Sequence, residues 1–330
     1  MDRQEPDNRP HAAAATGIFH TRRALLGASA AFALTAPLLG AGARRALAQA
    51  PHAITTSSVG ANMVLLQGSG GNVVALMGSD DVVLVDGGLA SSTTDLLAAV
   101  AAASRARPVR TLFNTHWHWD HTGSNETLAQ SGATLIAHEN TRLWLGTEIV
   151  SRWENRTYPA RPVSALPGKT FFYGAQQLSA AGAKIEYGYL PQAHTDGDLY
   201  VFFPEQNVLV AGDVVSGRGY PISDYATGGW LGGMIDSLKI LLEKSDAKTK
   251  IIPGTGPVLS RAQLQEQLTM SQAVVTSISN SYYKGETWSE FIATRPTQAF
   301  DARWGNPDIF LRTAYDGAWG HITEIRRVTR

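Results

Sequence analysis

The sequence predicts an α/β protein, an αββα sandwich that carries a C-terminal helical extension. Short apolar and β-branched runs separated by glycine-rich turns predict strands, and the alanine- and leucine-rich runs among them predict helices. This order occurs twice along the chain, so we expect two halves that each contribute a sheet and its covering helices. A cluster of three histidines and one aspartate directly follows one predicted strand. It indicates that the end of that strand carries the chemistry.

The composition is that of an ordinary globular protein, and it excludes several classes of site. The chain has 330 residues, of which 44% are hydrophobic and 17% are charged, and this is long enough for one large domain or two small ones. It has no cysteine, which excludes disulfide frameworks, zinc fingers and thiol nucleophiles. The formal net charge is zero and there is no basic stripe, so we expect no nucleic-acid partner. The partner that we do expect is a small-molecule substrate.

The N-terminal segment has the features of a twin-arginine secretory signal, which we place at residues 1–48. The pair Arg22-Arg23 precedes a mildly apolar run over residues 24–43, and a small-residue cleavage site ends at Ala48. A membrane-spanning anchor is the alternative, but the run is rich in alanine and glycine and contains a proline, which makes it a poor span. We therefore expect a bacterial periplasmic or secreted protein with no membrane anchor after cleavage.

The mature chain is expected to form a single domain over residues 49–330, because no linker or low-complexity segment divides it. Its core is expected at about residues 60–260 and the helical extension at about residues 260–330. The aromatic residues of the extension are expected to pack it onto the sandwich, and a role in a pocket or an oligomer contact is left open. The oligomeric state is also left open.

The first half of the domain predicts a β-meander followed by alternating helices and strands. Glycine-rich turns divide the first three strands, and two serines offer an N-cap for the first helix. We expect strands at Ala61–Gln67, Asn72–Met77, Asp81–Val85, Val109–Phe113 and Thr134–Ala137, and helices at Ser91–Ser104, Ser124–Gln130 and Glu139–Leu145.

The second half repeats this logic after a segment that is hard to assign. Residues 146–169 predict an irregular loop beside the site, whose aromatic residues either contact the substrate or pin the loop to the core. We expect strands at Phe171–Tyr173, Lys184–Tyr189, Leu199–Phe203, Asn207–Val210 and Lys250–Pro253, and helices at Leu231–Lys244 and Leu264–Ser279, the last with Ser260 as a candidate N-cap.

The histidine cluster lies at Asn114–Gly123, on the loop that leaves a short buried strand. Alternation along an extended loop turns His116 and His118 to the same side, about 6.5–7 Å apart, where two neutral imidazoles can bind one divalent ion. Asp120 and His121 point elsewhere as the chain turns, and could hold a second ion or orient a metal-bound water. A merely solvated turn is the alternative, which this combination of residues disfavours.

The cluster closely resembles the metal signature of the metallo-β-lactamase-fold hydrolases. The pattern His-x-His-x-Asp-His after a strand is among the more specific short motifs. The run Val82–Gly88 also resembles that family's strand ending in an Asp-Gly turn under the metal site, and the resemblance covers about residues 60–260. It implies the metallo-β-lactamase fold for the predicted sandwich.

The resemblance implies two further ligands, His194 and Asp213. His194 matches the third histidine of the first metal site, and three histidines leave one coordination position open for water. Asp213 follows an apolar strand and matches the family's bridging aspartate, which spans two metals; a turn aspartate is the alternative. Asp196 and Asp198 are expected to be turn residues or to fix an imidazole's tautomer by accepting its second N–H.

Thr255 departs from the family pattern. Relatives usually carry Gly-His-Gly-Pro where this chain has Gly254-Thr255-Gly256-Pro257, and the missing histidine is the last ligand of the second metal. We therefore expect Zn²⁺ as the cofactor, with one tightly bound ion and a second ion that Thr255 weakens; iron or manganese are left open. The flanking glycines are expected to leave room for a histidine. Nothing in the surroundings of His321 favours it as a substitute ligand.

These residues imply a metal-dependent hydrolase. The ion held by His116, His118 and His194 would lower the pKa of bound water toward about 7, and the metal-bound hydroxide would attack the carbonyl of an ester, lactone, thioester or amide. Asp120 is the expected catalytic residue, which orients the hydroxide and passes its proton to the leaving group. The identity of the substrate is not determined by the sequence.

Three alternatives remain at this point. The main one is a catalytically impaired metal- or ligand-binding protein, or a cofactor-accessory protein, with an incomplete second metal site. A true β-lactamase is disfavoured, because a cysteine or serine would be expected at Asp213 and a histidine at Thr255. A redox form of the fold is disfavoured because the chain has no flavin domain and no cysteine.

Overall fold

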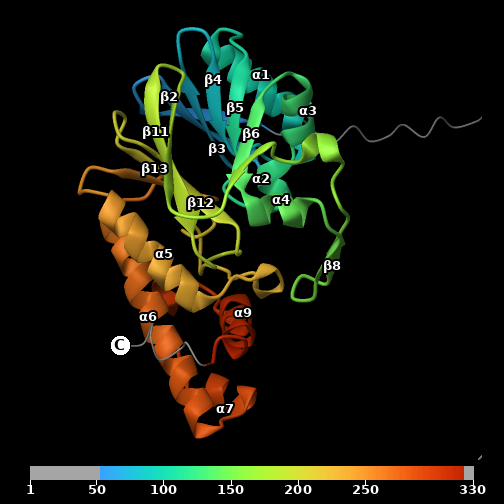
Figure 1. The fold of residues 1–330 in the computed structure, drawn as a ribbon. Coiled ribbons are helices and arrows are strands. Elements are labelled where there is room, and N and C mark those ends of the chain that lie inside the picture. The colour runs from blue at the N-terminus through green and yellow to red at the C-terminus, as the bar shows by residue number, and fades with distance from the viewer. Residues whose placement is uncertain (1–52, 323–330) are drawn as a thin grey trace, which may run out of the picture. The chain divides into compact units, whose positions relative to one another are not determined.

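The computed structural model describes residues 53–322 and places them in β-sheets flanked by helices (Figure 1). The predicted signal sequence, residues 1–48, lies outside the described residues. Within the described part of the chain, one sheet has seven strands, a second has five and a third has two. The two large sheets with their helices confirm the predicted αββα sandwich and its C-terminal helical region.

The larger sheet begins with the predicted meander and ends in parallel strands. In spatial order it contains β1 (Thr55–Gly60), β2 (Met63–Ser69), β3 (Gly71–Met77), β4 (Val82–Val85), β5 (Val109–Phe113), β6 (Thr134–His138) and β9 (Lys169–Phe171). Antiparallel pairing connects β1 to β4, and parallel pairing connects β4, β5, β6 and β9. The loops that leave β4 and β5 therefore start at the same edge of the sheet.

The smaller sheet is formed by the second half of the chain. In spatial order it contains β10 (Ala175–Ala180), β11 (Ala183–Leu190), β12 (Asp198–Phe203), β13 (Val208–Gly212) and β14 (Lys250–Pro253). The first four strands pair antiparallel, and β13 and β14 pair in parallel. The antiparallel pairing puts the start of β12 and the end of β13 at one edge of this sheet.

The described residues contain the five predicted helices and four α-helices that were not predicted individually. They are α1 (Thr93–Ser104), α2 (Trp119–Thr122), α3 (Asn125–Gln130), α4 (Glu139–Leu145), α5 (Leu231–Lys244), α6 (Arg261–Lys284), α7 (Trp288–Ala293), α8 (Asp301–Trp304) and α9 (Asp308–Trp319). The predicted cap of α6 is present: Ser260 and Gln263 form a reciprocal capping box. Among residues 53–322, no helix is long and apolar enough to cross a membrane.

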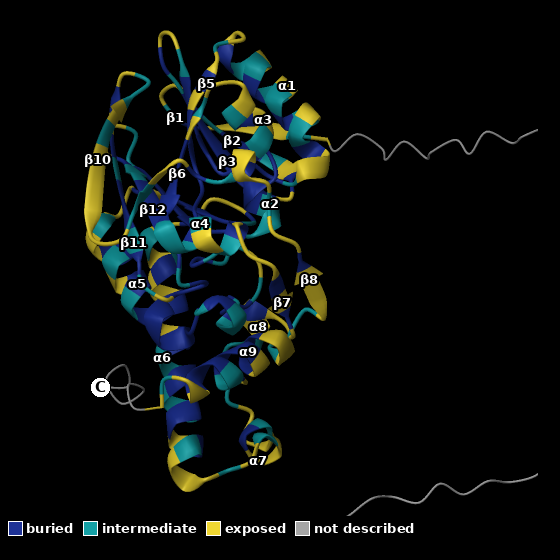
Figure 2. Cartoon of the chain, turned by 45° about the vertical axis from the view of Figure 1, so that its right-hand side comes forward, coloured by how far each residue is buried: buried dark blue, intermediate teal, exposed yellow. Residues whose placement is uncertain are grey.

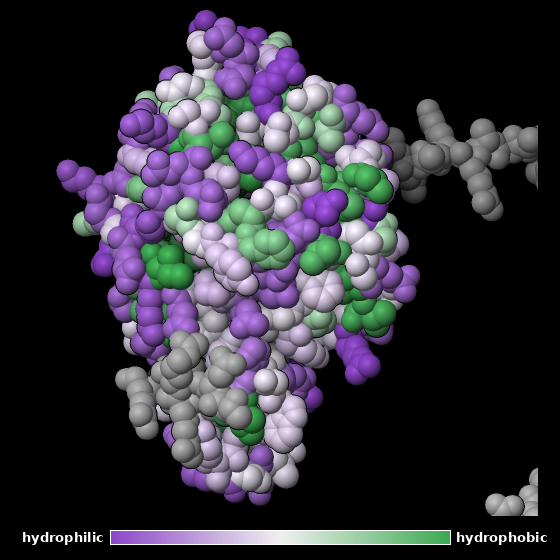
Figure 3. All heavy atoms as spheres, in the orientation of Figure 1, coloured by the Kyte–Doolittle hydropathy of each residue, from purple (hydrophilic) through white to green (hydrophobic). Residues whose placement is uncertain are grey.

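Three hydrophobic clusters define the four layers. Between the sheets, side chains such as Phe113 of β5 pack with Tyr187 of β11 and Phe203 of β12. A second cluster joins the larger sheet to α1 and α3, and a third joins the smaller sheet to α5, α6 and α9 (Figure 1). The C-terminal helices therefore extend the core of the smaller sheet. The surface seen from the same side is mainly polar, with small, separate apolar areas (Figure 3).

Four strands lack a sequence signal and were not predicted. β1 and β10 lie at the sheet edges and are mostly polar and exposed, so neither shows an apolar face (Figure 2). Within the predicted irregular loop, residues 146–169, β7 (Ile149–Ser151) and β8 (Arg156–Tyr158) form a short antiparallel hairpin. Of the predicted strand Phe171–Tyr173, only Phe171 lies in β9; the prediction is wrong for the next two residues, whose side chains are exposed.

Candidate metal centre

The predicted ligands lie on loops and a short helix at the ends of strands from both large sheets. Each ligand lies close to the end or the start of a strand. The two sheets pack against each other through the inter-sheet cluster, and this brings ligands from both sheets together. His116 and His118 follow β5, Asp120 and His121 lie in α2, His194 lies on the loop before β12, and Asp213 directly follows β13.

Four of these residues converge on one point. His116, His118, His194 and Asp213 each offer one ligand atom, and these atoms all lie within 4.8 Å of one another. The Nε2 of His194 is 3.0 Å from the Nδ1 of His118 and 3.6 Å from Oδ2 of Asp213, and the Nε2 of His116 is 3.7 Å from that same oxygen. Neighbouring ligands in a tetrahedral zinc site are about 3.4 Å apart, given bonds of about 2.0–2.1 Å. The spacing therefore fits a zinc-sized ion.

The rings of His116 and His194 are oriented by acceptors on their Nδ1 atoms. His116 donates to Oγ1 of Thr115 at 3.0 Å, and His194 donates to the carbonyl oxygen of Ile222 at 2.7 Å. The Nε2 of His116 is buried without a hydrogen-bond partner among the described residues. Burial, followed by the charges of the neighbouring histidines, holds the pKa of His116 well below its ordinary value. This ring is therefore neutral, the form in which histidine binds a metal.

His118 is oriented by Asp224, which the sequence analysis did not identify. The Nε2 of His118 donates to Oδ2 of Asp224 at 3.1 Å, and that carboxylate also accepts from Thr227 at 2.7 Å and from the indole of Trp153 at 2.9 Å. Burial raises the pKa of Asp224, but the hydrogen bond and charge of His118, together with the hydrogen bonds from Thr227 and Trp153, lower it more, to about 2. Because the other nitrogen of each ring carries the proton, Nδ1 of His118 and Nε2 of His194 face each other as two unprotonated nitrogens 3.0 Å apart. A cation bound between them stabilises this arrangement.

The Asp224→Asn substitution is expected to weaken zinc binding about tenfold, because loss of an outer hydrogen-bond partner of a ligating histidine typically costs 10–100-fold. Competition with a chromophoric chelator measures the dissociation constant. Asp246→Asn is the control, since Asp246 accepts from the side chain of Asn207 and the backbone N–H of Lys248 and not from a ligand ring. Equal zinc affinities of the two variants and the unmodified protein would show that Asp224 does not position His118.

The two other aspartates of this region do not orient an imidazole, contrary to one of the alternatives expected for them. Asp198 accepts from the backbone N–H groups of His194 and Thr195 and from the hydroxyl of Thr195. Burial raises the pKa of Asp198 to about 7 against these donors. Asp196 accepts from Trp144 at 2.7 Å. Both residues fix the loop that presents His194, while a backbone carbonyl fixes its ring.

Asp120, His121 and Asp213 form a second, less compact group. The Nε2 of His121 is buried without a hydrogen-bond partner among the described residues, and it lies 3.7 Å from Oδ2 of Asp120 and 3.7 Å from Oδ1 of Asp213. The other nitrogen of His121 donates to Asp86 at 2.8 Å. Gly71 is required beside this ring, because a Cβ at that position would lie 2.5 Å from an imidazole carbon.

The charges of this second group favour a cation. Burial lowers the pKa of His121, but the carboxylates of Asp120, Asp86 and Asp213 raise it further, to about 10. Asp213 presents Oδ2 to the histidines of the first group and Oδ1 to His121. This is the placement that a carboxylate needs in order to bridge two ions.

Thr255 lines a small cavity of about 120 Å³ next to Asp213. The expectation that its flanking glycines leave room for a histidine is wrong. A Cβ on Gly254 would lie 1.8 Å from Oδ1 of Asp213, and a Cβ on Gly256 would lie 2.9 Å from Cγ of Arg218. Both glycines are closely packed, so space for a larger side chain has to come from the cavity.

His321 lies elsewhere. Its ring stacks on the indole of Trp230, with 4.2 Å between the ring centroids and 6° between the planes. Among the described residues it does not belong to the group whose ligand atoms converge. His321 is therefore not a substitute for the missing histidine.

The metal ligands open into a cavity of about 360 Å³. The hairpin β7–β8 supplies one wall through Trp153 and Tyr158, so the loop lies beside the site as predicted. Tyr158 also packs against Trp117 and Trp119, at 5.2 and 5.4 Å between ring centroids, and thus pins the loop as well. The lining residues are Leu89, His118, Trp119, Asp120, Trp153, Glu154, Arg156, Tyr158, His194, Asp213 and Ile222.

Comparison with known proteins agrees with this architecture. The family model of the metallo-beta-lactamase superfamily matches residues 66–257, more than half of the chain. Among curated proteins, the 2,4-dinitroanisole O-demethylase subunit alpha of Nocardioides sp. (strain JS1661) is 29% identical over 128 residues. That match covers 38% of this chain and 35% of the relative, so the chain spans only about a third of the relative's length.

Two solved structures share the fold. A metallo-beta-lactamase from Pontibacter korlensis is similar with a TM-score of 0.54 and 19% identity, over 67% of this chain and 99% of that chain. The stereoselective inverting sec-alkylsulfatase from Pseudomonas sp. is similar with a TM-score of 0.63 and 15% identity, over 82% of this chain and 51% of that chain. At such identities the likeness concerns the fold and not the reaction.

Proposed function

Because the chain belongs to the metallo-β-lactamase superfamily, we propose that it is a metal-dependent hydrolase of a carbonyl compound, namely an ester, lactone, thioester or amide. The observation that carries the proposal is the convergence of His116, His118, His194 and Asp213 on one point, at the base of a cavity large enough for a small substrate. Zinc bound there would activate a water molecule and polarise the carbonyl group.

Asp120 is the residue that we propose as the proton carrier. Its side chain lines the cavity and is 38% exposed, so it can reach a bound substrate. Burial raises the pKa of Asp120, but the charges of His121 and His118 lower it more, so the net shift is downward and the carboxylate is ionised near neutral pH. An ionised carboxylate can accept a proton from the attacking water and pass it to the leaving group.

A second candidate function follows from Thr255. It stands where relatives usually have a histidine, so the second group of metal ligands lacks one imidazole. The protein would then be a catalytically impaired metal- or ligand-binding protein, or an accessory subunit. The curated relative is by its name one subunit of an O-demethylase, which supports testing for a partner chain. It also adds 2,4-dinitroanisole to the substrates worth testing.

The hydrolase proposal predicts turnover that depends on metal. Protein stripped with a chelator is expected to be inactive, and one equivalent of zinc, manganese or iron is expected to restore cleavage of at least one of the carbonyl compounds. The panel comprises aryl esters, lactones, thioesters, amides and 2,4-dinitroanisole, followed by product analysis. Metal binding without any turnover across the panel would favour the second candidate instead.

A further inference from the structure

The cavity above the metal ligands has three chemically distinct parts. Its base is formed by ligand side chains, including His118 and Asp213. Its walls are mostly aromatic, with the indoles of Trp119 and Trp153 and the ring of Tyr158. The remaining polar lining, Glu154 and Arg156, comes from the hairpin β7–β8 and the turn within it.

The hairpin is held in place, so its side chains present a fixed surface. Trp153 donates its indole N–H to Asp224 at 2.9 Å, and Asp224 is fully buried. Tyr158 is buried against Trp117 and Trp119. These contacts anchor both ends of the segment that carries Arg156.

Arg156 presents a guanidinium group that has no acidic partner among residues 53–322. Its guanidinium carbon lies 4.5 Å from the ring centre of Tyr158 and 5.7 Å from that of Trp119, so the charge is stacked on the cavity wall. Within residues 53–322, no carboxylate lies within 4.0 Å of it. Glu154 forms no ion pair with Arg156 among the described residues, and its Oε1 accepts from the hydroxyl of Tyr158 at 2.9 Å.

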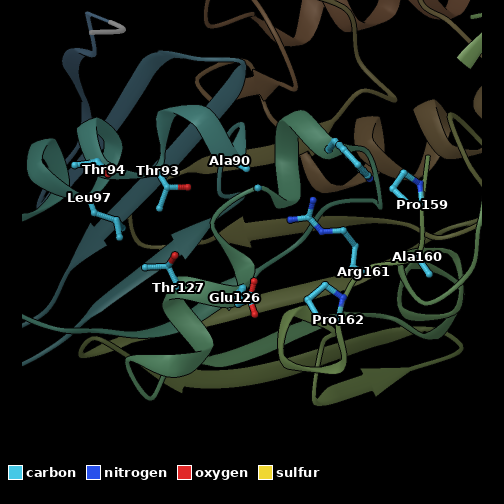
Figure 4. A pocket seen from close by; sticks show the side chains of 12 residues that line it. Ala90, Thr93, Thr94, Leu97, Glu126, Thr127, Pro159, Ala160, Arg161 and Pro162 are labelled. Carbon is cyan, nitrogen blue, oxygen red and sulfur yellow. The ribbon is translucent and has the colours of Figure 1, made fainter. Parts of the chain in front are cut away.

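A second guanidinium group, that of Arg161, also lies over the ring of Trp119. The indole of Trp119 lines both the metal-ligand cavity and a neighbouring groove of about 790 Å³. Arg161 extends into that groove, near Glu126 and the start of α1 (Figure 4), and its guanidinium carbon lies 5.0 Å from the ring centre of Trp119. Burial lowers the pKa of Arg161, and its side chain has no ion pair among the described residues. Two guanidinium groups that form no ion pair with another described residue thus lie near the ring of Trp119.

We propose that the cavity takes a substrate with an aromatic body and an anionic substituent, whose negative charge pairs with Arg156 while the hydrolysable bond lies against the metal ligands. The inference rests on the proposed function and names its substrate class. In the reaction, the oxygen of water bonds to the carbonyl carbon, the bond to the leaving oxygen breaks, and a proton from the water goes to that leaving oxygen. Arg156 takes no part in these steps and acts by binding.

Glu154 defines the competing expectation. Its Oε2 is buried without a hydrogen-bond partner among the described residues, so a cationic substituent could bind there instead. Three acetate esters that differ only in the para substituent separate the two: phenyl acetate, 4-acetoxybenzoate and the 4-acetoxy-trimethylanilinium ion. Each kcat/KM is divided by the rate of hydroxide-catalysed hydrolysis of the same ester, which removes the difference in intrinsic reactivity.

The zinc-loaded protein is expected to favour 4-acetoxybenzoate over phenyl acetate by about five- to tenfold, as is typical of one charge-assisted pair at a partly exposed position. Arg156→Met is expected to abolish this preference, which is read as the ratio of the two normalised kcat/KM values in the same variant. Arg152→Met is the matched control, because Arg152 is on the same hairpin but lines a different cavity, beside α9. A preference for the cationic ester overturns the proposal. So does a preference for 4-acetoxybenzoate that is unchanged in Arg156→Met.

Binding separates the failure of this inference from the failure of the proposed function. Calorimetry of the metal-loaded protein compares 4-acetamidobenzoate with acetanilide, two amides that differ by the carboxylate. Tighter binding of the carboxylate that Arg156→Met removes supports the anionic pocket even if no ester is hydrolysed. If all three esters are hydrolysed without any effect of charge and the two amides bind equally, the proposed anionic substrate class is refuted. The proposed hydrolase function then still stands.

Discussion

Replacement of His116, His118 or His194 by alanine is expected to remove most of the tightly bound metal. Each substitution deletes one imidazole from a group whose four ligand atoms lie within 4.8 Å of one another. Loss of an outer partner of a ligand costs roughly 10–100-fold in affinity, and loss of the ligand itself should cost at least about that much. Elemental analysis of the purified variants after gel filtration measures the effect, and activity is expected to fall in parallel.

His138→Ala is the matched control for these three variants. His138 is also buried, but its ring stacks on Tyr189 at 4.1 Å between centroids and its Nε2 lies 2.9 Å from the carbonyl oxygen of Phe172. Its removal is expected to lower stability and to leave the metal content unchanged. If any one of the three ligand variants retained full occupancy while remaining folded by circular dichroism, the assignment of that ligand would be wrong.

The Thr255→His substitution is expected to raise the zinc stoichiometry from close to one toward two. Among the described residues, the second group has only Asp120, His121 and Oδ1 of Asp213 as metal ligands, and a hydroxyl is a weak zinc ligand. A new imidazole should raise the affinity for the second ion by at least about 10–100-fold. Because Gly254 is closely packed, the ring has to enter the cavity of about 120 Å³ beside Asp213.

Zinc titration by calorimetry measures both dissociation constants. Thr255→Val is the control, since it is similar in size to threonine but offers no donor, and it is expected to leave the first ion unchanged. Two equally tight ions in the unmodified protein would contradict the account of Thr255 and would require another donor for the second site.

The sequence predicted those elements whose pattern is local. β5, β14, α4 and α5 have the predicted bounds, because each is a compact apolar or amphipathic run between clear turns or caps. β1 and β10 were not predicted, because a polar edge strand is stabilised by pairing with its neighbour and needs no apolar face. The hairpin β7–β8 was not predicted, because its strands have only three residues each, too few to show a pattern.

The candidate site was predictable to the extent that one motif contained it. His116, His118, Asp120 and His121 lie within six residues, but His194 and Asp213 required resemblance to a family, since nothing local says which distant loop folds back. Asp224 could not be predicted. It lies 106 positions from His118, in a turn with no pattern of its own, and only the packed loops bring the two together.

The direct test of the central claim is the location of the metal in crystals of the zinc-loaded protein. Diffraction data collected on both sides of the zinc absorption edge give an anomalous difference map. The account predicts the strongest peak at about 2.0–2.1 Å from Nε2 of His116, Nδ1 of His118 and Nε2 of His194, with Oδ2 of Asp213 adjacent. A map with no peak among these atoms, or with its strongest peak elsewhere in the chain, would contradict it.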